Sequence, residues 1–143
     1  MGGSLRIAVM RDPSGEWDPV RGDHHLDLDL EREEWEDLFF AVLGAPAWEA
    51  GLLENEGVFA YEERQKRNFE TYLKSKGFEM LGRISDMYQD AEYEPSEVAE
   101  LREECSRVEE LTDNAEVLEG VRKLVFACNE AVKIGSGLIL LSD

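Results

Sequence analysis

A change of hydrophobic period between residues 26 and 42 constrains the fold of this chain more than any other feature. Leu26, Leu28 and Leu30 alternate with aspartates, which is the two-residue period of a strand with one buried face. Apolar residues then recur three, four and seven positions after Trp35, which is the period of an amphipathic helix. A strand followed directly by a helix, each with one apolar face, indicates helices packed on a sheet.

Short apolar segments near both ends of the chain predict two more strands. Residues 5–10, Leu-Arg-Ile-Ala-Val-Met, lie between two glycines and a turn-rich Asp-Pro-Ser-Gly sequence. Residues 138–141 are a continuous apolar run that is too short for a helix. We expect these first and last strands to be neighbours in a small sheet of two to four strands.

Three later segments have helical periodicity, which brings the expected number of helices to about four. The first ends at Gly77, the second begins with Ser96 as its cap, and the third has a wide apolar stripe from Val117 to Val132. Residues 45–57 have no clear period, and either an irregular connection or a short helix would fit them. We therefore predict one α+β domain over residues 1–143.

Several features indicate a cytoplasmic protein. Residues 1–10 lack the long apolar region and cleavage site of a secretory signal, and no apolar run approaches the roughly 20 residues that span a bilayer. The two cysteines, Cys105 and Cys128, fall on apolar helix faces and have no CxxC partner. We expect both to be buried thiols and expect no disulfide.

Charge is the outlying property of the composition. The chain has 33 Asp and Glu residues against 15 Lys and Arg residues, which gives a formal net charge of −18. Such a field repels nucleic acids and anionic membranes, and it speeds encounter with a basic protein. Solubility alone would also explain an acidic surface. We expect no nucleic-acid or membrane partner.

The acidity is concentrated between Asp90 and Glu119, where twelve acidic residues accompany two arginines. Glu97, Glu100 and Glu104 recur at i, i+3 and i+7, so they share a helix face, where each pair of like charges costs about 0.2–0.5 kcal/mol. A binding surface would explain this cost, and a merely solvated face is the alternative. The predicted partner-binding residues are Asp90, Glu92, Tyr93, Glu97, Glu100 and Glu104.

The sequence nominates no catalytic residue, metal ligand or cofactor site. Asp23, His24 and His25 match the DHH triplet of metal-dependent phosphoesterases, but the other aspartate motifs of those enzymes are missing. The cysteines and histidines lack zinc-ligand spacing, and no glycine-rich nucleotide loop is present. We therefore expect a non-enzymatic protein. A small hydrolase or metal-dependent enzyme with an acidic pocket is the alternative, and a structural or regulatory subunit is a third hypothesis.

Residues 77–143 carry a specific order of short motifs. An Ile-Ser-Asp connector with tyrosines precedes a Tyr-x-Pro-Ser helix start and Leu-Arg-Glu-Glu-Cys, and a Cys-bearing last helix leads to Leu-Leu-Ser-Asp. This order resembles immunity proteins of bacterial polymorphic toxin systems. The resemblance implies a protein that binds a cognate toxin tightly and blocks its active site or an essential surface. If the toxin is a nuclease, acidic residues would occupy the groove for phosphates, and buried aromatic residues would add affinity.

Overall fold

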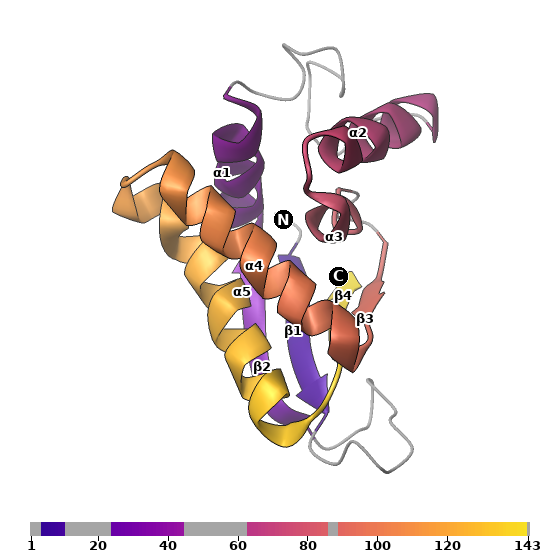
Figure 1. Ribbon diagram of the computed structural model, residues 1–143, viewed down its shortest axis with the longest axis vertical. Coiled ribbons are helices and arrows are strands. Elements are labelled where there is room, and N and C mark those ends of the chain that lie inside the picture. The colour runs from indigo at the N-terminus through magenta and orange to yellow at the C-terminus, as the bar shows by residue number, and fades with distance from the viewer. Residues whose placement is uncertain (1–3, 11–23, 45–62, 86–88, 143) are drawn as a thin grey trace.

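The computed structural model describes residues 4–10, 24–44, 63–85 and 89–142 of the chain. Over these ranges the chain forms four strands and five helices (Figure 1). In chain order they are β1 (Ser4–Met10), β2 (His24–Glu31), α1 (Arg32–Leu43), α2 (Glu63–Ser75), α3 (Glu79–Gly82), β3 (Ala91–Tyr93), α4 (Pro95–Leu111), α5 (Ala115–Ile134) and β4 (Leu138–Ser142). This architecture confirms the predicted α+β class.

The strands form one antiparallel sheet in the order β2-β1-β4-β3. Strand β1 lies between β2 and β4, so that Ile7 is opposite Leu28 on one side and Leu140 on the other. The predicted pairing of the first and last strands is therefore confirmed. At the β3 edge, Gly137 allows a close approach, because a Cβ atom there would lie 2.5 Å from the carbonyl oxygen of Tyr93.

Helices α1, α4 and α5 lie on one face of the sheet, and α5 contacts β1, β2 and β4 (Figure 1). The core fills the space between these layers, and its strand residues include Ile7, Leu30 and Leu140, which are fully buried. Cys105 and Cys128 are buried in the same core, as predicted. Burial raises the pKa of the Cys128 thiol to about 12, so this side chain behaves as a small apolar residue.

Aromatic residues connect α1 to α2 and to the segment after α3. Trp35 meets Phe39 edge to face with ring centroids 5.0 Å apart, and Phe39 meets Phe69 of α2 in the same way at 5.2 Å. The indole N–H of Trp35 donates a hydrogen bond of 2.6 Å to the carbonyl oxygen of Ile84. Edge-to-face geometry and a satisfied indole N–H are the arrangements that buried aromatic residues favour.

Two short elements and one helix start differ from the sequence-based predictions. Strand β3 and helix α3 are only three and four residues long, too short for a hydrophobic period to reveal them. The cap of α4 is Glu94 instead of the predicted Ser96, and Pro95 is the first helical residue, where its fixed φ suits a helix. Asn114 caps α5, because its side chain accepts a hydrogen bond of 3.0 Å from the backbone N–H of Glu116.

Candidate partner-binding surface

The turn that joins α2 to α3 is fastened to α4 by Arg107. Gly77 occupies this turn with φ +86°, a left-handed conformation that favours glycine. The Arg107 guanidinium donates a hydrogen bond of 2.6 Å to the carbonyl oxygen of Gly77 and lies 5.0 Å from the centre of the Phe78 ring. One of the two arginines of α4 is thus engaged in an intramolecular contact.

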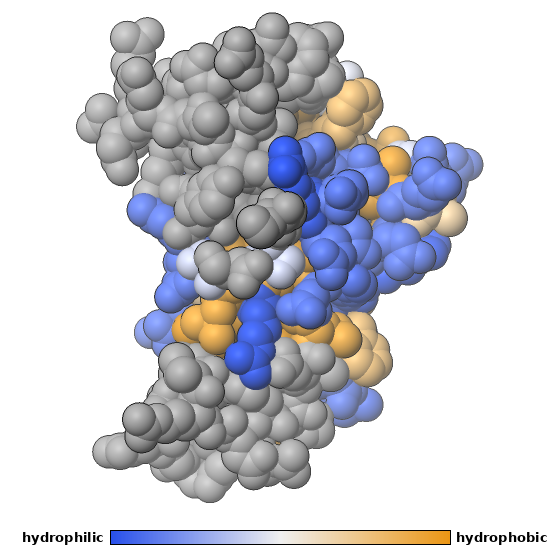
Figure 2. Space-filling model, turned by 180° about the vertical axis from the view of Figure 1, so that it is seen from behind, coloured by the Kyte–Doolittle hydropathy of each residue, from blue (hydrophilic) through white to orange (hydrophobic). Residues whose placement is uncertain are grey.

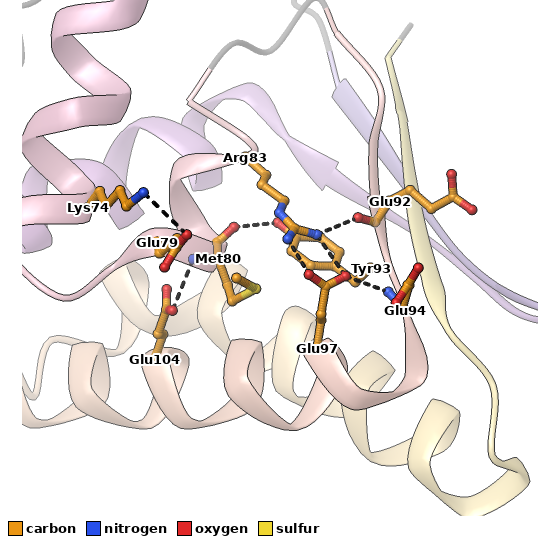
Figure 3. Close-up of polar contacts among 9 residues, drawn as sticks. All are labelled: Lys74, Glu79, Met80, Arg83, Glu92, Tyr93, Glu94, Glu97 and Glu104. Carbon is orange, nitrogen blue, oxygen red and sulfur yellow. Dashed lines mark hydrogen bonds and ion pairs between the residues drawn. The ribbon is translucent and has the colours of Figure 1, made fainter.

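Glu104 caps α3 from the neighbouring helix α4. One carboxylate oxygen accepts a hydrogen bond of 3.0 Å from the backbone N–H of Met80 (Figure 3). The other accepts a hydrogen bond of 2.9 Å from the backbone N–H of Leu81. The first N–H groups of a helix have no partner within it, so an acceptor from elsewhere satisfies them. Burial raises the pKa of Glu104, and the two backbone hydrogen bonds oppose that shift. Glu104 is 5% exposed, so the structure places it inside the molecule and not on the exposed face for which it was predicted.

Tyr93 is also an internal residue. It is 1% exposed, and its hydroxyl donates a hydrogen bond of 2.6 Å to the carbonyl oxygen of Met80 (Figure 3). Burial holds the pKa of its phenol well above the ordinary value. Met80 is thus held by Glu104 through its N–H and by Tyr93 through its carbonyl. Tyr93, which was predicted to contact a partner, is therefore buried like Glu104 and does not lie on an exposed surface of the molecule.

Glu97 forms an ion pair with Arg83, which follows α3. The guanidinium donates two hydrogen bonds to the Glu97 carboxylate and a third, 2.9 Å long, to the carbonyl oxygen of Glu92 (Figure 3). The hydrogen bond from Arg83 is the main cause that lowers the pKa of Glu97 to about 2. This ion pair joins the end of α3 to β3 and to the first turn of α4, so the charge of Glu97 is balanced within the molecule.

The other three predicted residues are exposed, and they differ in their contacts. Asp90 accepts hydrogen bonds of 2.8 Å and 3.0 Å from the backbone N–H and the hydroxyl of Ser142, which ties the start of β3 to the end of β4. The carboxylates of Glu92 and Glu100 have no hydrogen bond or ion pair with the part of the chain that the structure describes. The structure therefore does not bring the six predicted residues together on one surface.

A different set of carboxylates forms the exposed acidic side of α4, which we term the acidic ridge. Its members are Glu100, Glu103 and Glu110, which are all exposed and lie on one side of the helix because they are three and seven residues apart. None has an ion pair among the described residues. The arginines of α4 do not balance them by ion pairs, because Arg107 binds Gly77 and Arg102 donates to Asn129.

The pocket between α2 and α3 offers less for recognition. It has a volume of about 340 Å³ and is lined mainly by charged residues, among them Lys74, Glu79 and Arg83. Lys74 lies 3.7 Å from Glu79, and Arg83 is paired with Glu97. Both cations are thus already neutralised, so the pocket gives no argument for an anionic ligand.

The metal hypothesis and the membrane prediction concern parts of the chain that are only partly described. Within the described ranges, no three His, Cys, Asp or Glu residues are arranged to hold a metal ion. Asp23 and the side chains of His24 and His25 lie outside the description, as do residues 45–57. None of the described helices combines the length and apolar character that crossing a bilayer requires.

Relatives provide no independent indication of function. No protein-family model matches the chain, and neither the curated proteins nor the solved structures give a significant match.

Proposed function

We propose that this chain is a non-enzymatic binding protein that neutralises a cognate bacterial toxin, and that the acidic ridge contacts a basic surface of that toxin. The observation that carries the proposal is the outward-facing charge of Glu100, Glu103 and Glu110, which have no ion pair within the described part of the chain. The motif resemblance over residues 77–143 supplies the toxin as the class of partner.

The rigidity of α4 supports a role for the ridge in binding. The side of α4 that faces the core buries Val98, Leu101 and Val108, and the side that faces α3 is fixed through Glu104 and Arg107. A helix that is held in this way presents its outer carboxylates without needing to order itself on binding. A preformed surface loses less conformational entropy in a complex, so more of the interaction energy contributes to affinity.

Long-range charge supports the same partner class. The net charge of −18 extends an attractive field toward a basic protein, and fields of this kind raise association rates by factors of about 10 to 1,000 at low salt. A toxin that acts on nucleic acid would carry the basic groove that such a field attracts. Blocking this groove requires binding and no chemistry, which is why we propose a protein without catalytic residues.

Charge reversal on the ridge tests the proposal. The triple variant Glu100→Lys, Glu103→Lys and Glu110→Lys is expected to slow association with the toxin encoded beside this gene by about 10-fold or more at low salt. The salt dependence of the association rate should fall as well. Stopped-flow mixing over a series of salt concentrations measures both quantities.

A matched control keeps the same change of net charge away from the ridge. Asp29, Glu70 and Glu119 are exposed carboxylates of β2, α2 and α5, and their replacement by lysine should slow association less than the ridge variant does. Equal effects of the two triple variants would show that only total charge matters and that the ridge is not the contact surface. If the wild-type protein does not bind the neighbouring toxin, the proposed function itself is wrong.

A further inference from the structure

An open apolar groove lies where the end of α1 meets the turn between α4 and α5. Its volume is about 300 Å³, and its lining includes Phe40 and Ala41 from α1, Leu111 from α4, and Asn114 and Val117 at the start of α5. This volume is at the small end of the range of about 300–1,000 Å³ that is usual for ligand pockets. It suits one or a few apolar side chains of a partner.

Two of the lining residues are large apolar side chains that water reaches. Phe40 is 48% exposed and Leu111 is 54% exposed. Single exposed apolar residues are common on protein surfaces, but here two of them line the same groove. Viewed from behind, apolar surface bordered by hydrophilic residues is visible on the side that carries α1 and the turn between α4 and α5 (Figure 2).

Several carboxylates lie close in the sequence to residues that line the groove. Asp37 precedes Phe40 by three residues on α1, and its pKa is raised first by burial and then by the nearby charges of Glu116, Glu33 and Glu34. Glu116 of α5 directly precedes Val117, which lines the groove. Glu110 and Asp113, which are both exposed, flank Leu111 in the sequence.

The C-terminal ends of two helices contribute negative potential at the groove. Gly44, which ends α1, lines the groove, and so does Thr112, which ends α4. Neither helix has a basic residue in its last turn. The C-terminal end of a helix carries a partial negative charge, which a nearby cation stabilises. The N-terminal end of α5, where Asn114 lines the groove, carries the opposite partial charge and offsets part of this potential. A cation from a partner would meet the C-terminal ends of α1 and α4 together with the carboxylates adjacent to the lining residues.

We propose that this groove binds a basic amphipathic segment of a protein partner. An apolar side chain of the segment fills the space between Phe40 and Leu111, and flanking Lys or Arg residues meet the carboxylates and the ends of α1 and α4. Helices that insert their apolar face into a groove are a recurring mode of recognition. The carboxylates repel an acidic segment or a nucleic acid, so the charge around the groove selects the partner.

The identity of this partner as the toxin rests on the proposed function, which the groove extends. Glu110 belongs to the acidic ridge and directly precedes Leu111, so the ridge leads along α4 into the groove. A basic surface drawn to the ridge by charge would then place an apolar residue in the groove. The ridge would set mainly the association rate, and the groove mainly the dissociation rate.

A synthetic peptide tests the groove without the toxin. The probe is a short helical peptide of lysine and leucine with one central phenylalanine, and its affinity is measured by calorimetry. Leu111→Gln and Phe40→Gln should each weaken binding by about 10-fold or more, as expected for removal of an apolar anchor. Phe126→Gln is the matched control, because Phe126 is an equally exposed (50%) aromatic residue of α5 outside the groove lining, and it should leave the affinity unchanged.

Each result either supports or overturns the groove assignment. Circular dichroism and thermal unfolding first show that the variants are folded, which we expect because both positions are about half exposed. Binding that is unchanged by Leu111→Gln, or a peptide with glutamate in place of lysine that binds as tightly, overturns the assignment. If peptide binding requires Leu111 but the toxin does not bind, the groove assignment is supported and the proposed toxin-neutralising function is wrong. If the groove variants bind the toxin as tightly as the wild type does, only the assignment of the groove as a toxin-binding site is overturned.

Discussion

Glu104→Leu is expected to lower the free energy of unfolding by about 2–6 kcal/mol, because it leaves two buried backbone N–H groups without an acceptor and each such group costs about 1–3 kcal/mol. The affected groups are the N–H groups of Met80 and Leu81, which Glu104 now satisfies at 3.0 Å and 2.9 Å. Urea unfolding followed by circular dichroism measures the change. A loss below about 1 kcal/mol would show that the cap contributes little.

Glu104→Gln is the matched variant, because its amide oxygen can still accept hydrogen bonds. Burial raises the pKa of Glu104 above the ordinary value of 4.5, so ionisation of this group opposes folding. The contribution of Glu104 to stability is therefore fully present below pH 4.5 and decreases as the pH rises through its folded-state pKa. The stability difference between wild type and Glu104→Gln should accordingly shrink as the pH rises, which unfolding at several pH values tests. A difference that grows with pH would contradict this account.

Trp35→Ala is the second large expected effect, with a loss of about 3–5 kcal/mol in the free energy of unfolding. Trp35 is 1% exposed, and its ring centroid lies 5.0 Å from that of Phe39. Its indole N–H donates a hydrogen bond to the carbonyl oxygen of Ile84. The alanine variant removes the ring and leaves a cavity between α1 and the segment after α3. Denaturant unfolding monitored by circular dichroism measures the loss.

Trp35→Phe separates the hydrogen bond from the packing. Phenylalanine keeps most of the apolar volume but leaves the Ile84 carbonyl without the indole donor, so we expect an intermediate loss of about 1–3 kcal/mol. Phe40→Ala serves as the control, because this neighbouring aromatic residue is 48% exposed and should change stability by less than about 1 kcal/mol. Similar losses for Trp35→Ala and Phe40→Ala would mean that Trp35 does not connect these elements.

Much of the fold follows from hydrophobic periodicity. The strand at Leu28 and Leu30, the helix that begins near Trp35 and the wide stripe of α5 are all long enough for their periods to be recognised. The pairing of β1 with β4 was also predicted, since both are apolar and lie at the ends of the chain. Periodicity missed β3 and α3, which are too short to have a measurable period.

The exposed surface was harder to predict than the fold. Helix periodicity shows which residues share a side of a helix, but not which element packs against that side. Glu97 and Glu104 do share one side of α4, as their spacing predicted, but that side packs against α3. Their partners lie far away in the sequence: Arg83 is 14 residues before Glu97, and Leu81 is 23 residues before Glu104. No local pattern reveals such contacts. The acidic ridge is the adjacent side of the same helix. Only the packing of α3 against α4 shows which of these two sides stays exposed.

The two buried thiols provide a built-in measure of how often the protein opens. A thiol reacts as its thiolate, and burial raises the pKa of both cysteines while the surrounding core excludes reagents. Alkylation of the folded protein therefore has to wait for an opening that exposes Cys105 in α4 or Cys128 in α5. These helices carry the acidic ridge and one side of the groove. A lower alkylation rate of the native protein in the presence of a partner would therefore show that binding suppresses their opening.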